Sequence, residues 1–170
     1  MGNTLGYKAS HFIRMCTGLP TYQYSAIVGI LLGDGNVSIT QGAKSIITAR
    51  ISIAQSMAHI EYIWFVWQIL SPYCQSFPYL NRHKFKGKTF YSIVLKTRTY
   101  AVFSTIYKHF ISITGVKQVP IDIYHLLNEI GFAHWIMCDG SRLKNGALIL
   151  CTDSFSIQDV VKLMNVLNIK

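Results

Sequence analysis

The spacing of apolar and polar residues predicts alternating helices and strands along the first two thirds of the chain. Residues 22–33 form one apolar run. Its length favours a helix, although periodicity alone does not distinguish it from a buried strand. Residues 36–40 and 47–53 alternate polar and apolar side chains, which is the pattern of half-buried antiparallel strands. Residues 41–44 between them suit a hairpin loop.

The same order of elements is predicted a second time downstream. Residues 56–70 carry apolar side chains at helical spacing and end before Pro72, a residue that helices do not continue through. A second strand pair is predicted at 75–82 and 89–97, joined by a basic turn that contains Gly87. Residues 100–111 are again helix-like. The order αββαββα, complete near residue 114, predicts a fold of the α+β class.

Beyond the connection at residues 115–120 the pattern starts again. A short helix is predicted at 121–129, followed by an apolar run at 130–137, a strand at 147–151 and an amphipathic helix at 156–167. Ser154 or Ser156 is expected to cap that last helix, because a serine hydroxyl accepts a hydrogen bond from a free N–H of the first turn.

Two apolar runs end in the same dipeptide, Asp-Gly, at Asp34 and at Asp139. An Asp-Gly turn at a helix end is common, so one copy carries little information, whereas two copies indicate an internal repeat. Helices that pack side by side need small residues where their backbones approach, and Gly29 and Gly33 meet that need. If the two helices run parallel, both carboxylates come together, and such a pair can hold divalent metal ions against phosphates.

The charge distribution points to a polyanionic partner. The chain has 16 Lys and Arg against 7 Asp and Glu, a formal net charge of +9. No acidic residue lies between Glu61 and Asp122, while tyrosines and phenylalanines are frequent there. A solvated basic face is the alternative, but this mixture favours nucleic acid. The positive residues of the segment are Arg82, Lys84, Lys86, Lys88, Lys96, Arg98, Lys108 and Lys117.

Other features exclude several classes of protein. The four cysteines form no CxxC pair, so neither a disulfide framework nor a zinc finger is expected, and a reducing compartment is assumed. No apolar run has the ~20 residues that a membrane span requires, and no targeting signal is visible in the first 25 residues.

Together these motifs resemble the LAGLIDADG homing endonucleases, in the single-chain, two-motif branch encoded in fungal mitochondrial introns. The likeness runs from about residue 24 to the C-terminus and is strongest at 25–35, 70–76 and 133–162. It implies antiparallel saddle sheets backed by helices. We expect an irregular leader at 1–21, a first unit at 22–115 and a second unit at 116–170. The second unit is expected to be C-terminally truncated, because its last strand pair and final helix are missing.

The resemblance also implies a site. Asp34 and Asp139 match the metal-binding carboxylates, the carbonyls of Gly33 and Cys138 are further ligand candidates, and Mg²⁺ or Mn²⁺ is the implied cofactor. Lys117 matches a basic residue near the scissile phosphate, with an ordinary surface lysine as the alternative. His134 stands where a small residue or Tyr is usual, so looser helix packing is expected. The implied helix interface comprises Gly29, Gly33, Ala133 and His134, and the implied DNA contacts are Ser38, Thr40, Thr48, Arg50, Ser52, Arg82, Lys84, Lys86, Lys88, Lys96 and Arg98.

Three functional hypotheses follow from the resemblance. The first is a site-specific endonuclease that cuts both strands of a long DNA site, with intron homing as its role. The second is an RNA maturase that assists splicing of its host intron, with intron RNA as partner. The third is an inactive remnant that still binds nucleic acid. The resemblance further implies a mitochondrial location and, for full-length members, a monomer without membrane contact.

Overall fold

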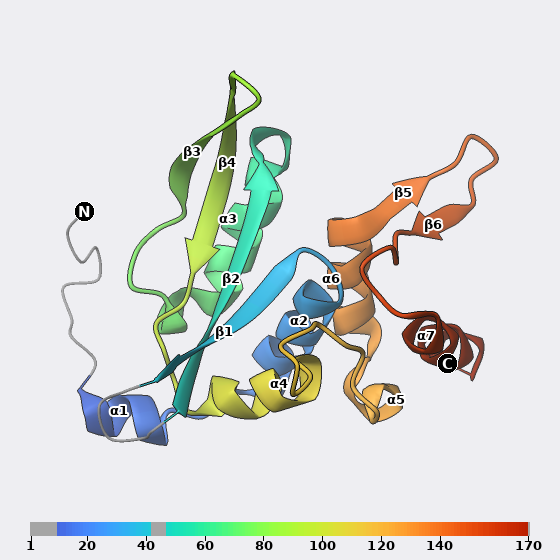
Figure 1. Ribbon diagram of the computed structural model, residues 1–170. Helices are drawn as coiled ribbons and strands as arrows, with labels where there is room; N and C mark the ends of the chain where they lie inside the picture. The colour runs from blue at the N-terminus through green and yellow to red at the C-terminus, as the bar shows by residue number, and fades with distance from the viewer. Residues whose placement is uncertain (1–9, 42–46, 170) are drawn as a thin grey trace. The chain divides into compact units, whose positions relative to one another are not determined.

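The computed structural model describes residues 10–41 and 47–169, and its elements follow the predicted order (Figure 1). The series α2, β1, β2, α3, β3, β4, α4 confirms the αββαββα prediction, and a second motif helix, a short strand pair and a final helix come after it. The bounds are α1 His11–Cys16, α2 Thr21–Leu32, β1 Gly35–Gln41, β2 Ile47–Ser56, α3 Ile60–Leu70, β3 Tyr79–Phe85, β4 Lys88–Lys96, α4 Val102–Phe110, α5 Ile123–Leu126, α6 Glu129–Asp139, β5 Gly140–Arg142, β6 Leu148–Leu150 and α7 Ile157–Ile169.

The chain forms two compact units. One contains the residues up to 18 together with 38–104, and the other contains 19–37 together with the residues from 105 onward. The first unit therefore holds most of the sheet, and the second holds both motif helices. The predicted division into residues 22–115 and 116–170 is a different one, because it follows the two sequence repeats and not the compact units. It stays a prediction.

The first unit is built on an antiparallel four-stranded sheet with the order β1-β2-β4-β3. Ile51, Ile53 and Leu95 are buried on one face, and α3 packs along β2 and β4 with its own buried residues, among them Ile63 and Val66. Burial of side chains of this size stabilises the fold by about 1.5–3 kcal/mol each. The alternation of strand side chains leaves the other face of the sheet polar.

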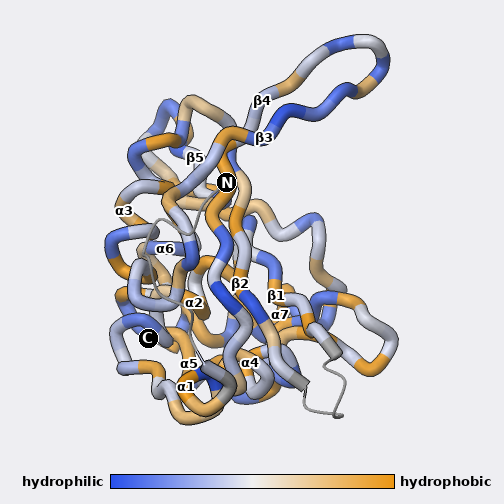
Figure 2. The backbone as a smooth tube through the Cα atoms, turned by 90° about the vertical axis from the view of Figure 1, so that its left-hand side faces the viewer, coloured by the Kyte–Doolittle hydropathy of each residue, from blue (hydrophilic) through white to orange (hydrophobic). Residues whose placement is uncertain are grey.

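The β3–β4 pair continues as a two-stranded hairpin past the end of β2. The pairing of β2 with β4 ends at Ser56 opposite Ser92, whereas β3 stays paired with β4 up to Phe85 opposite Lys88. Lys86 and Gly87 form the turn with φ values of 47° and 74°. Positive φ at both central residues fits the twist of a tight hairpin. Figure 2 shows this hairpin extending past the rest of its own sheet, with hydrophilic and hydrophobic residues interleaved along it.

The second unit is centred on α2 and α6, which lie side by side. Residues 25–32 of α2 are all buried, which explains why this run showed no amphipathic period. On the α6 side, Trp135 is 1% exposed. The short pair β5–β6 follows α6 directly, and α7 adds the buried residues Leu163 and Val166.

Two predicted element boundaries were wrong. Residues 1–21 were expected to be irregular, but His11–Cys16 is a helix whose first turn is capped by the hydroxyl of Ser10, which accepts from the Ile13 N–H. β3 begins at Tyr79 rather than near residue 75, because Pro78 cannot donate to a strand ladder. The predicted loop at 41–44 lies largely outside the described residues. Among the helices of the described residues, none is long and apolar enough to cross a membrane.

Ser156→Ala should lower the stability of the second unit, because Ser156 and not Ser154 is the cap of α7. The Ser156 hydroxyl accepts a hydrogen bond of 3.2 Å from the Asp159 N–H. Loss of such a cap costs about 1 kcal/mol, or roughly 2–4 °C in a chain of this size. Thermal unfolding followed by circular dichroism measures the shift. Ser154→Ala is the matched control and should leave the melting temperature unchanged; equal shifts would contradict the assignment.

Candidate active site

The two motif helices pack in parallel with their backbones in close contact. A Cβ placed on Gly29 would lie 1.9 Å from the carbonyl oxygen of Gly131, and one placed on Gly33 would lie 2.3 Å from the Cβ of Cys138. Contacts under 3 Å leave no room for a methyl group. Because residue numbers rise together along both helices, the C-terminal ends meet. The prediction that Gly29 and Gly33 serve as approach points is therefore supported by the geometry.

On the α6 side, the contacts to Gly29 come from the predicted His134 and from Gly131, which was not predicted. Gly131 and His134 are buried, whereas Ala133 is exposed. Positions that share a helix face are three or four residues apart, so Ala133, two residues after Gly131, is on another side. Its assignment to the interface was wrong. The looser packing expected at His134 is not found, since its side chain is 2% exposed and its Cβ lies against Gly29.

A hydrogen bond between the start of α6 and α2 was missed by the sequence reasoning. The amide of Asn128 donates to the Ser25 hydroxyl at 2.9 Å, and its carbonyl oxygen accepts from the Gly131 N–H at 3.1 Å. Asn128 is thus the N-cap of α6 and a link between the motif helices at once. The signal available in the sequence was an Asn directly before Glu129.

Asp34, Asp139 and Lys117 come together where the two helices end. The carboxyl carbon of Asp139 would lie 3.6 Å from a Cβ on Gly33. The Lys117 ammonium donates to the carbonyl of Gly33 at 2.5 Å and to that of Gly35 at 3.3 Å, the two carbonyls on either side of Asp34. Lys117 is therefore not an ordinary surface lysine, because its ammonium group points into the site.

The three charged groups influence one another electrostatically. Burial raises the pKa of Asp139, the neighbouring Asp34 raises it further, and Lys117 acts against both. Burial lowers the pKa of Lys117, while Asp139 and Asp34 act to raise it. Groups whose pKa values are shifted by burial and by charged neighbours in this way are candidates for a functional site.

Lys117 is held in place by the segments that follow α4 and precede α7. The backbone of Lys117 forms an antiparallel bridge with Ile111, and its ammonium lies 5.6 Å from the centre of the Phe155 ring. Asp159 is 7% exposed. Burial acts to raise its pKa, but hydrogen bonds from Lys162, Ser156 and the Val119 backbone outweigh this and lower it. Asp159 therefore anchors the strand-like segment that carries Lys117, a role the sequence did not reveal.

The site offers only a few oxygen atoms that could bind a metal ion. The described part of the chain contains no group of three or more His, Cys, Asp and Glu that could hold a metal ion, so the carboxylates of Asp34 and Asp139 are the protein's charged donors here. A cation such as Mg²⁺, which keeps several waters and takes phosphate oxygens, fits two carboxylates better than an ion that needs a full protein cage. The Gly33 carbonyl already accepts from Lys117. The side chain of Cys138 lies next to Gly33.

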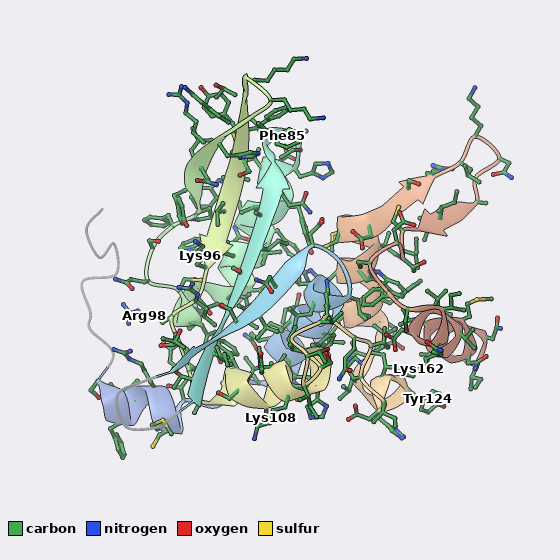
Figure 3. The ribbon with its side chains drawn as sticks, in the orientation of Figure 1. Phe85, Lys96, Arg98, Lys108, Tyr124 and Lys162 are labelled. Carbon is green, nitrogen blue, oxygen red and sulfur yellow. The ribbon has the colours of Figure 1, made fainter. Side chains whose placement is uncertain are left out.

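The polar face of the sheet carries part of the predicted DNA contacts. The Arg50 guanidinium donates to the Ser38 hydroxyl at 3.2 Å, and Ser52 lies directly opposite Lys96 in the register of β2 and β4. Thr40 and Thr48 share this face by alternation along β1 and β2. These residues therefore form one continuous polar surface, with Lys96 exposed on it (Figure 3).

The basic residues of the hairpin are divided between its two faces. Lys88 shares a face with Lys96, whereas Arg82 and Lys84 have the opposite parity and lie on the side of the buried Ile93. Arg82 and Lys84 were predicted to contact DNA together with Arg50, but the strand register places them on the opposite face of the sheet from Arg50. Lys86 is in the turn. Arg98 follows the end of β4, where it is half-buried near the Cys74 thiol.

Comparison with known proteins decides the family. The family model described as LAGLIDADG DNA endonuclease family matches residues 24–170. The chain belongs to the LAGLIDADG endonuclease family. This confirms the resemblance inferred from the paired Asp-Gly motifs, and the match includes both of these motifs.

Individual relatives of this LAGLIDADG chain carry different names. The cytochrome b mRNA maturase bI2 of Debaryomyces hansenii is 32% identical over 167 residues, which is 96% of this chain and 62% of the maturase. The DNA endonuclease I-ChuI of Chlamydomonas applanata is 25% identical over 161 residues, 88% of this chain and 72% of that protein. The chain thus spans less than two thirds of the maturase.

A solved structure of a homing endonuclease confirms the fold. The homing endonuclease I-WcaI, bound to its DNA recognition sequence, superposes with a TM-score of 0.79 at 23% identity, covering 91% of this chain and 69% of that one. The predicted α+β fold with an antiparallel sheet backed by helices is therefore correct.

Proposed function

We propose that the protein is a site-specific DNA endonuclease that hydrolyses phosphodiester bonds in duplex DNA. The observation that carries the proposal is the meeting of Asp34, Asp139 and Lys117 at the ends of two parallel motif helices. The polar sheet face with Arg50 and Lys96 supports a duplex partner, because short polar side chains and cations suit base edges and phosphates.

The roles of the residues follow from their chemistry. Asp34 and Asp139 would hold Mg²⁺ or Mn²⁺, with the Gly33 and Cys138 carbonyls as further candidate ligands. When bound, the metal supplies a Lewis acid that polarises the phosphate and lowers the pKa of water. Lys117 offers an ammonium group that stabilises negative charge developing on the phosphate oxygens. The burial of the site strengthens that interaction, because fewer water molecules screen it.

The experiment that tests the proposal is cleavage of plasmid DNA that carries the host intron-insertion site. Purified protein and Mg²⁺ should convert the supercoiled plasmid to a linear form, and a plasmid without the site should stay intact. If neither Mg²⁺ nor Mn²⁺ supports cleavage of the target plasmid, the endonuclease function is contradicted.

Lys117→Met should reduce cleavage about a hundredfold, the scale of losing one preorganised positive or hydrogen-bonding group at a reacting centre. DNA binding should persist, because the polar sheet face is untouched. The exposed Lys144 provides a matched control, and Lys144→Met should cleave like the wild type. If both variants lost cleavage activity equally, Lys117 would have no specific role in the site.

The pH dependence gives a second measurement on Lys117. Because burial lowers its pKa, cleavage that needs the ammonium form should decline with rising pH earlier than an ordinary lysine would allow. Lys117→Arg keeps its charge at all working pH values, so its alkaline limb should move to higher pH. If cleavage by Lys117→Arg fell at the same alkaline pH as cleavage by the wild type, the decline would be caused by another group.

A second candidate function rests on the likeness to a protein named as an mRNA maturase. Splicing assistance needs an RNA-binding surface and does not need the two carboxylates. A splicing assay of the host intron, with and without the protein, tests it, and no change in splicing rate would dismiss it. We further expect an intron-encoded protein of the mitochondrion, in keeping with a relative named as a cytochrome b mRNA maturase.

A further inference from the structure

The hairpin of β3 and β4 exposes aromatic rings on a strongly basic surface. Phe85 is 62% exposed and Phe90 is 43% exposed, although both lie in regular strands. They lie beyond the point where β2 stops pairing with β4, and no third strand of the described residues pairs with the hairpin there. Figure 3 labels Phe85 at the end of this hairpin and Lys96 further along the same strand pair.

Strand alternation collects these rings on one side of the hairpin. His83 lies directly opposite Phe90, and Phe85 directly opposite Lys88; Tyr79 shares their parity on β3. The His83 and Phe90 rings are stacked at 5.8 Å with an interplanar angle of 17°. We refer to Tyr79, His83, Phe85, Lys88 and Phe90 as the hairpin front face. It continues the polar side of the sheet, since Lys96 lies opposite Ser52.

Positive charges accompany the rings. The Lys86 ammonium lies 5.5 Å from the centre of the Phe85 ring, and the Lys96 ammonium lies 5.7 Å from that of Tyr79. No acidic residue occurs between Glu61 and Asp122. Lysines on a projecting hairpin protect it against pairing with other strands. Exposed phenylalanines are not explained in this way, because they make such a hairpin more prone to association.

The face of an aromatic ring selects the kind of nucleic acid it can bind. In a duplex the bases stack on one another and present only their edges to a protein. Unpaired bases can instead stack on aromatic side chains, while neighbouring cations hold the phosphates. The short polar residues on β1 and β2 suit duplex edges, and the hairpin front face suits unstacked bases.

We propose that the hairpin front face binds unpaired nucleotides of RNA, with bases stacked on Phe85 and Phe90 and phosphates held by Lys86 and Lys88. The inference deepens the RNA-binding candidate and rests on it for its biological role, while the binding itself is independent of splicing. The opposite side of the hairpin carries Leu80, Arg82 and Tyr91, which makes it a built-in comparison.

The test measures binding of the full chain to fluorescein-labelled oligonucleotides of about 12 nucleotides, a length within the range of one such platform. The probes are oligouridine RNA, oligothymidine DNA and a duplex of the same length, followed by fluorescence anisotropy at one fixed salt concentration. Phe90→Leu should weaken RNA binding about 5- to 100-fold, because leucine keeps apolar bulk but has no ring face. The affinity of Phe90→Leu for the duplex should change less than about twofold. Phe90→Tyr, which keeps a ring, should bind RNA like the wild type.

Tyr91→Leu is the matched control on the other side of the hairpin, where Tyr91 is 50% exposed. It should leave RNA binding unchanged, and circular dichroism should show that all variants melt like the wild type. Equal losses on RNA and duplex, or equal losses in Phe90→Leu and Tyr91→Leu, would overturn the proposal. Equal binding of both single strands supports it, since stacking does not depend on the sugar, whereas binding of the DNA strand alone overturns RNA as the ligand.

The outcomes also separate this inference from the two proposed functions. RNA binding that depends on Phe90, without any effect on splicing, would remove the maturase function and keep the stacking platform. Absence of RNA binding by the wild type would overturn the platform and leave the endonuclease proposal untouched. A 5-iodouridine probe gives direct support if irradiation attaches it to the peptide that contains Phe85 or Phe90.

Discussion

Asp34→Asn and Asp139→Asn are each expected to remove DNA cleavage while DNA binding is retained. A carboxylate that binds the metal directly should matter more than an outer partner, whose loss costs about 10- to 100-fold. We therefore expect losses above roughly a hundredfold, measured as single-turnover cleavage of the target plasmid. The amide keeps the shape of the side chain but removes the charge that a hard cation requires. Gel-shift titration of the target duplex measures binding.

Stability gives an independent readout on Asp139. Its pKa is raised in the folded protein, so the fold favours the neutral carboxyl. The resulting stabilisation is present below the ordinary pKa of Asp and is lost as the pH rises through the raised value. At neutral pH the ionised group thus acts against folding, and Asp139→Asn should melt at a somewhat higher temperature than the wild type. At acidic pH the difference should vanish.

The same variants separate the two proposed functions. Splicing assistance should survive Asp34→Asn, because RNA binding does not use the carboxylates. The exposed Asp153 on the loop before α7 provides the control, and Asp153→Asn should leave cleavage unchanged. Cleavage by Asp34→Asn at the wild-type rate would show that the carboxylate pair is not the catalytic centre.

Gly29→Ala should strongly destabilise the second unit and abolish cleavage with it. The added methyl would lie 1.9 Å from the Gly131 carbonyl oxygen, and backbone on both sides prevents a local adjustment. Overpacking of this kind costs about 3 kcal/mol at the upper end of its usual range, which corresponds to roughly 6–12 °C for a chain of this length. Thermal unfolding by circular dichroism measures the effect.

Gly18→Ala is the matched control for this substitution. A Cβ on Gly18 meets nothing within 4 Å, so the variant should melt and cleave like the wild type. If Gly29→Ala also behaved like the wild type, α2 and α6 would have to lie further apart than the structure shows.

Local sequence patterns were sufficient to identify most of the elements. Alternation along residues 36–40 and 47–53 predicted β1 and β2, because one face of each strand is buried and the other is solvated. The short helix α1 was missed, since six residues produce little periodicity and its Ser10 cap resembles a loop serine. The repeated Asp-Gly motif was enough to predict that two carboxylates belong to one site.

The sequence by itself determined the family, the order of the elements and the two motif aspartates, because each rests on residues close together in the chain. Only the tertiary structure decided the environment of Lys117, which bonds to the Gly33 carbonyl 84 residues away. It also decided that Gly131 and not Ala133 meets Gly29, and that Arg82 and Phe90 lie on opposite faces of one hairpin. Such features depend on helix rotation and strand register, and a shift of one residue in register moves every side chain to the other face.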